Sequence, residues 1–119
     1  MPLLSLTTSA AVPSPARRNE IFTRLTALLA RELDKPEGYV MVALNPGAQL
    51  SFGGDASAPA CYAELKNVGV FTPERVAALS QLLCAELESL LRVSPARIYI
   101  EFTAADGALW GWNGETFAG

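Results

Sequence analysis

The residue with the clearest capacity for chemistry is the proline at position 2. Methionine aminopeptidases generally remove the initiator when the second residue is small, so the mature chain would begin with a secondary amine on a rigid ring. Apolar surroundings lower the pKa of such an amine by disfavouring its charged form. An amine tuned toward neutrality can abstract a proton from the carbon next to a carbonyl. A Met-Pro start usually has no chemical role, so Pro2 alone does not establish a catalyst.

The composition argues against metal, redox and nucleic-acid chemistry. There is no histidine, the commonest general base and metal ligand, and we expect no metal and no organic cofactor. The two cysteines, Cys61 and Cys84, have neither CxxC spacing nor a disulfide framework around them, and Cys84 is predicted to be a small buried hydrophobe. The net charge of -3 argues against a nucleic-acid partner.

Length and hydropathy indicate one domain over residues 1–119 with a real core, since half of the residues are hydrophobic. No apolar run approaches the ~18 residues that span a bilayer, and the N-terminus lacks the basic region of a secretory signal. We therefore expect a soluble, cytoplasmic protein without membrane contact. Secretion by a route that needs no signal peptide stays open.

In the first half, residues 2–8 are predicted to form a short strand. Ser14 followed by Pro15 is typical of a helix N-cap with proline at the first helical position, and this helix should end near Leu33. Arg17 and Arg18 fall in its first turn, where the macrodipole disfavours cations. Residues 39–44 (YVMVAL) indicate a strand, and residues 49–52 could form another.

The second half repeats this pattern. Residues 61–68 (CYAELKNV) indicate a strand with Glu64 and Lys66 on one face. Thr72-Pro73 begins a second helix, residues 97–102 (RIYIEF) form the next strand, and residues 109–112 could add a short one before the Asn113-Gly114 turn.

The predicted fold is therefore α+β, with two β-α-β repeats of the split βαβ type. Two parallel pairs would form a four-stranded mixed sheet, with both helices on one face. The other face, lined by residues of 39–44 and 97–102, would stay exposed in a monomer. A surface of that kind predicts self-association.

Six short pieces, in order and at matching intervals, resemble the macrophage migration inhibitory factor family of the tautomerase superfamily. They are MPL at the start, DKPEGYVMV at 34–42, QLSFGG at 49–54, LKNVG at 65–69, SPARIYI at 94–100 and WGWNGETFA at 110–118. The resemblance covers essentially the whole chain. It implies the same two repeats, assembled as a homotrimer with active sites between subunits.

The resemblance also implies roles for individual residues. Pro2 would be the catalytic base, while Lys35 and the backbone N–H of Val68 would hold the substrate. Without the family, Lys35 would be interpreted as a solvated lysine at a helix C-terminus. Tyr99 would come from the neighbouring subunit to line the pocket. Further pocket positions are Glu101, Trp112 and Phe117.

Two departures from the family pattern matter. Glu101 stands where animal members have asparagine, and a carboxylate near the base would raise the pKa of the proline and repel an anionic substrate unless it turns outward. Ala60 and Ala63 replace the CxxC of animal members, so a thiol–disulfide activity is not expected.

Three hypotheses follow. The first is a keto–enol tautomerase of the phenylpyruvate tautomerase or dopachrome isomerase kind, an isomerase whose substrates are small α-keto acids or their enols. The second is a signalling or interaction protein of the same family with weak or vestigial tautomerase activity, and here a receptor partner is left open. The third is a trimeric scaffold.

Overall fold

Both helices begin at the Ser-Pro and Thr-Pro pairs. In the computed structural model, which describes residues 1–118, α1 spans Pro15–Leu33 and α2 spans Pro73–Leu91. The Ser14 hydroxyl accepts the N–H of Arg17 at 3.1 Å, and the Thr72 hydroxyl accepts the N–H of Arg75 at 3.2 Å. Each cap satisfies a backbone donor that the first turn leaves free. The predicted starts of both helices are confirmed.

Arg17 explains why a basic residue is tolerated in the first turn of α1. Its guanidinium pairs with Glu20 at 2.8 Å and donates to the backbone oxygens of Ser89 and Leu90 at 3.3 and 2.6 Å. Those oxygens belong to the last turn of α2, where a cation is favourable. The start of α1 is unfavourable for the positive charge of Arg17, but the end of α2, which its guanidinium contacts, is favourable for it.

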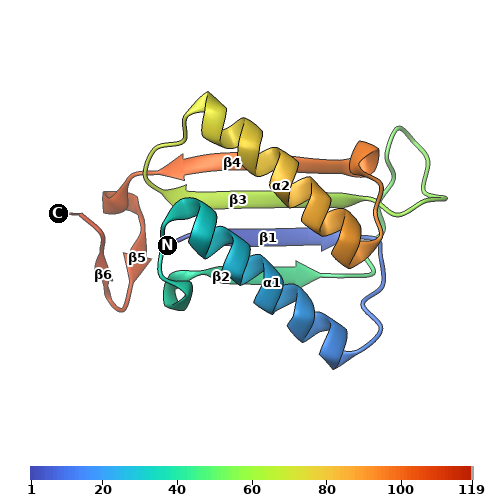
Figure 1. Ribbon diagram of the computed structural model, residues 1–119, viewed down its shortest axis with the longest axis horizontal. Helices are drawn as coiled ribbons and strands as arrows, with labels where there is room; N and C mark the ends of the chain where they lie inside the picture. Colours follow the sequence, from blue (N-terminus) through green and yellow to red (C-terminus); the bar gives the residue numbers. More distant parts are fainter. Residues whose placement is uncertain (119) are drawn as a thin grey trace.

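Four strands form one mixed sheet in the order β2-β1-β3-β4, with the bounds Leu3–Thr8 (β1), Met41–Asn45 (β2), Cys61–Val68 (β3) and Ile98–Ala105 (β4). β1 runs parallel to β2, β3 runs parallel to β4, and the central pair β1–β3 is antiparallel. Both helices lie across the same face of this sheet (Figure 1). The predicted split βαβ architecture is therefore confirmed.

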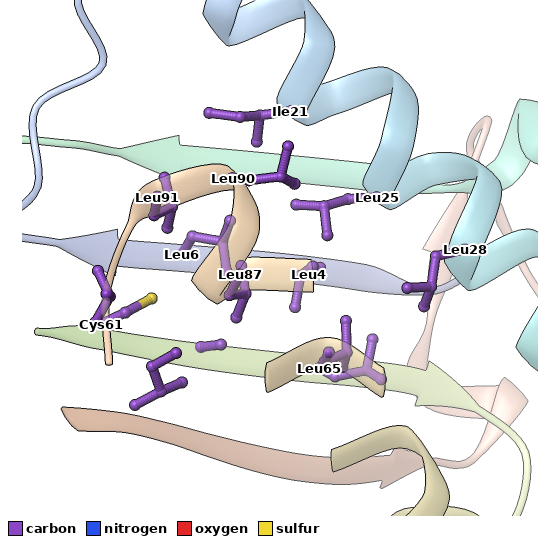
Figure 2. Packing of buried hydrophobic residues seen from close by; sticks show 14 of the residues in the cluster. Leu4, Leu6, Ile21, Leu25, Leu28, Cys61, Leu65, Leu87, Leu90 and Leu91 are labelled. Atoms are coloured by element: carbon purple, nitrogen blue, oxygen red, sulfur yellow. The ribbon is translucent and has the colours of Figure 1, made fainter. Parts of the chain in front are cut away.

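The core lies between the helices and the sheet (Figure 2). Alternate residues of β1 and β3 point into it, and leucines recurring at helical spacing on α1 and α2 meet them. The fully buried side chains from these four elements include Leu4, Leu6, Leu65, Ile21, Leu25, Leu29, Leu79, Leu83 and Leu87. Neither helix within residues 1–118 is long and apolar enough to cross a membrane.

The opposite face of the sheet is uncovered, as predicted, but it is less apolar than expected. Met41 and Tyr99 are 64% and 65% exposed on it. Between them, the register places Glu64 beside Glu101, and Lys66 lies on the same face of β3. The face therefore combines an apolar periphery with charged side chains, because alternation places both kinds on one side of each strand.

Local predictions differ from the structure at several points, including Arg97, which lies in a 3-10 turn (η2, Pro95–Arg97) before β4 begins. Tyr39 lies in a 3-10 turn (η1, Glu37–Tyr39), so β2 begins only at Met41. Residues 49–52 form no strand beyond a single bridge between Phe52 and Asp55. Leu109 also lies in a 3-10 turn (η3, Gly107–Leu109). Short apolar runs do not reveal whether a neighbouring strand is within reach, so propensity overstated these segments.

The chain ends in a small hairpin of β5 (Gly111–Trp112) and β6 (Glu115–Thr116). Its turn is the predicted Asn113-Gly114 pair, with φ of 52° and 79°. Positive φ at both central residues gives the turn a twist that suits a two-residue hairpin. The hairpin lies beside the N-terminus (Figure 1), where it helps to enclose the candidate site.

Candidate active site

A cavity of about 270 Å³ lies at the end of the sheet where β1 begins. The N-terminal segment, the η1 turn and the C-terminal β5–β6 hairpin surround it. Its lining includes Met1, Pro2, Tyr39, Met41, Trp112 and Phe117. Three of the predicted site residues, from opposite ends of the sequence, are therefore brought together.

Pro2 is fully buried at the base of this cavity. Its carbonyl oxygen accepts the N–H of Met41 at 3.0 Å, which fixes it against the start of β2. Met1 precedes it, so the free amine belongs to Met1 and donates to the Tyr39 oxygen at 3.1 Å. Burial lowers the pKa of this amine most, and the nearby charge of Lys35 lowers it further. The crevice thus favours an uncharged amine.

Lys35 and Val68 meet at the same end of the sheet. α1 ends at Asp34 in the left-handed conformation, and Lys35 follows with its N–H bonded to the Ala30 oxygen at 3.0 Å. The Lys35 ammonium donates to the Val68 oxygen at 3.2 Å. The last pair between β1 and β3 is Leu3 with Lys66, so β1 does not extend to Val68. The Lys35 ammonium and the end of β3 at Val68, which has no β1 partner, thus lie near the amine. Together they could hold an anion.

Aromatic rings form the mouth of the cavity. The Tyr39 and Trp112 rings meet edge to face at 5.4 Å, and Trp112 stacks with Phe117 at 6.1 Å. The N–H of Phe117 donates to the Gly107 oxygen at 3.0 Å. A Cβ on Gly107 would lie 2.5 Å from the Phe117 oxygen, so only glycine fits there. These contacts hold the rings over the N-terminus.

Tyr99 and Glu101 are not part of this cavity. The positions of Tyr99 and Pro2 can be compared along β3. Tyr99 lies opposite Tyr62 of β3, whereas Pro2 lies opposite residue 67, one step beyond the Leu3–Lys66 pair. Residues 62 and 67 are five apart, which is roughly 17 Å along a strand. A single subunit therefore does not bring Tyr99 to its own Pro2.

Glu101 is engaged elsewhere on the open face of the sheet. Its carboxylate accepts the Tyr62 hydroxyl at 2.5 Å, and this hydrogen bond, with burial, raises the pKa of Tyr62. The Tyr99 ring packs against Phe52 at 4.9 Å. Tyr99 thus belongs to the end of the sheet that lies away from Pro2, and Glu101, opposite Glu64, lies midway along the open face.

The cysteines and the carboxylates offer no second centre. Cys61 is buried, and burial raises the pKa of its thiol to about 11. Cys84 is only half-buried, contrary to the prediction, because it lies at the margin of the α2 stripe. Within residues 1–118, no three His, Cys, Asp or Glu side chains are grouped so that they could hold a metal ion.

Sequence reasoning missed three residues near the site. Tyr39, in the η1 turn, and Met41, the first residue of β2, both line the cavity because they lie where the chain enters β2. Asn67 was also passed over, and it is buried with no hydrogen-bond partner for its side-chain oxygen among the described residues. The alternation within β3 places Asn67 on the face of Ala63 and Leu65, and this was the available signal that its polar side chain is buried.

Comparison with known proteins gives one consistent family. The macrophage migration inhibitory factor (MIF) family model matches residues 1–118. The macrophage migration inhibitory factor of Meriones unguiculatus is 35% identical over 118 residues, 99% of this chain and the whole of that protein. A homologue from Trichinella spiralis is 36% identical over 98% of the chain and its own full length. The crystal structure of a homologue from Prochlorococcus marinus is 39% identical with a TM-score of 0.89, covering 98% of this chain and 99% of that one.

Proposed function

Because this chain belongs to the macrophage migration inhibitory factor family, we propose that it is a keto–enol tautomerase whose general base is the amine of Pro2, freed by removal of Met1. The substrate class is phenylpyruvate-like α-keto acids, with dopachrome-type compounds as surrogates. The observation that carries the proposal is the buried crevice, in which an amine near Lys35 has a lowered pKa. Pro2 lies next to Met1 in the lining of the same crevice, so removal of Met1 would place the Pro2 amine in these apolar surroundings.

The reaction needs one base and one anion holder. The unprotonated Pro2 amine takes a proton from the carbon next to the carbonyl, and the electron pair of that C–H bond moves to give an enolate. Pro2 then returns the proton to the enolate oxygen, which yields the enol. The reverse sequence gives the ketone, so atoms and charge balance without a cofactor.

Lys35 would hold the negative charge of the substrate. Its ammonium already donates to the Val68 oxygen, so it lies at the strand end where the Val68 N–H would also bind substrate. A fixed cation stabilises the charge that develops on an enolate oxygen. The apolar Trp112 and Phe117 rings would pack against the substrate's aromatic group.

The proposal includes a homotrimer. The sheet has one uncovered face, and Tyr99 is exposed at the end opposite to Pro2. A neighbouring copy could supply its Tyr99 and Glu101 to the cavity that the Pro2 end of the first copy forms. The hydrogen bond from Tyr62 of the same copy would then limit the movement of the Glu101 side chain toward that cavity.

The test compares the mature protein with Pro2→Gly, since glycine also permits removal of Met1. Intact mass establishes that the amine is free in both proteins, and the absorbance of the enol of phenylpyruvate reports the rate. We expect a loss of at least about 100-fold in kcat/KM, in line with general-base catalysis. A Pro2→Gly protein with the full rate would refute the assignment.

Glu101 supports a second candidate, an interaction protein with weak or vestigial tautomerase activity. A carboxylate delivered to the cavity would work against an anionic substrate. Mature protein with a proven free amine and no rate on several α-keto acids would favour this alternative. The oligomeric state, measured by light scattering, tests the trimer on which both candidates rest.

A further inference from the structure

Asn67 carries the one buried side-chain polar atom among residues 1–118 that lacks a hydrogen-bond partner. The residue is 5% exposed, and nothing in that part of the chain donates to its Oδ1. A buried acceptor without a partner destabilises the fold, and such groups in native proteins call for an explanation. An apolar residue of similar size would suit the surrounding core better.

Extending the β1–β3 register by one step places Asn67 opposite Pro2. The last pair between β1 and β3 is Leu3 with Lys66, and the next step along both strands is Pro2 opposite Asn67. Alternation points both side chains to the helix-covered face, as it does for Leu4 and Leu65, and both are buried there. Side chains opposite each other in an antiparallel pair have Cβ atoms about 5 Å apart.

From this placement we propose that Asn67 is a positioning residue for the base: its side-chain oxygen lies against Pro2 and supports the amine in the orientation that accepts a proton. The inference rests on the proposed function and adds a residue to it. Asn67 acts through Pro2 and does not touch the substrate.

The charges around Pro2 explain why such a residue is useful. Burial and Lys35 both disfavour a protonated amine at this end of the sheet. On β3, the neighbours Glu64 and Lys66 point to the opposite face, and the β5–β6 side contributes the uncharged Trp112 and Phe117. From η1, Tyr39 contributes its backbone oxygen. The carbonyl dipole of Asn67 would favour the protonated amine and so offset burial and the charge of Lys35. The amine can then still receive the substrate proton.

The experiment substitutes Asn67 by Leu and by Asp in the mature protein. Leucine removes the dipole and keeps the branching at Cγ, and the acidic limb of the kcat/KM profile should move down by about 0.5–1 pH unit. Aspartate adds a negative charge, and the limb should move up by about one unit or more. Asn45→Leu is the matched control, because Asn45 pairs with Thr7 at the other end of β1 and should cause no shift.

A second readout does not depend on catalysis. The Pro2 amine is titrated directly by NMR in protein labelled with 15N-proline, and its midpoint should move in the same directions. If Asn67→Leu does not fold, Asn67→Ser replaces it, with a smaller downward shift expected. Opposite shifts for Leu and Asp support the proposal.

Unchanged midpoints, or shifts of the same sign, would overturn it, even if Asn67→Leu raises the urea midpoint as a purely structural amide would. An inactive wild-type protein would instead refute the proposed function, and the NMR titration would still decide the role of Asn67.

Discussion

Replacing Lys35 by methionine removes the cation of the proposed site while retaining most of its apolar stem. Within residues 1–118, the ammonium makes a single hydrogen bond, to the Val68 oxygen at 3.2 Å. The fold should therefore tolerate the change. The substrate anion, in contrast, would lose its charged partner.

The expected magnitude is that of one charged hydrogen bond between Lys35 and the substrate. A hydrogen bond to a charged group contributes about 1.5–3 kcal/mol, so kcat/KM should fall roughly 10- to 150-fold on an α-keto acid. The substitution also removes a charge that lowers the pKa of the N-terminal amine. The pKa of the base should therefore rise, and because the unprotonated amine is the active form, the acidic limb of the profile should move to higher pH.

The assay is the full pH profile of kcat/KM on phenylpyruvate, followed by enol absorbance. Lys35→Arg should restore part of the rate, since it keeps the charge but not the compact shape. Arg31→Met is the matched control, because Arg31 is an exposed cation on α1. A Lys35→Met enzyme with an unchanged rate and an unshifted acidic limb would refute the assigned role.

Three further outcomes are expected. Gly107→Ala forces a methyl group against the Phe117 backbone, so it should displace the Phe117 ring. We expect a lower kcat/KM with little change in the thermal midpoint. An unchanged KM would count against a role for Phe117 in binding. Leu83→Ala should cost about 2–5 kcal/mol in urea unfolding, whereas Leu82→Ala on the exposed side of α2 should cost much less; equal costs would contradict the assigned core. Cys61 has a thiol pKa of about 11, so at pH 8 iodoacetamide should modify it far more slowly in the native protein than in urea, as read by intact mass.

The sequence predicted most accurately what depends on local chemistry. The Ser14-Pro15 and Thr72-Pro73 pairs specify the helix starts by themselves, and the alternation of residues 61–68 defines β3 and its two faces. Residues 49–52 form no strand beyond one bridge, and of residues 109–112 only the second half forms a strand, β5. Whether another strand lies alongside such a segment is a tertiary property, so β-propensity alone overstated their extent.

The site could be predicted only in part for the same reason. Pro2, Trp112 and Phe117 were expected from the resemblance, and the structure brings them to one cavity. Tyr99 lies at the other end of the sheet and Glu101 midway along its open face, so only a second copy could deliver them to the cavity. Asn67 requires the register between β1 and β3, which no spacing within β3 reveals.

The contact of Arg17 with the last turn of α2 has a consequence for how the molecule folds. The first repeat begins with a side chain whose partners, Ser89 and Leu90, lie near the end of the second repeat. β1 likewise pairs with a strand from each half. Neither half therefore has its own complete set of contacts, and unfolding should be cooperative across the whole chain, despite the internal symmetry that makes the halves look separable.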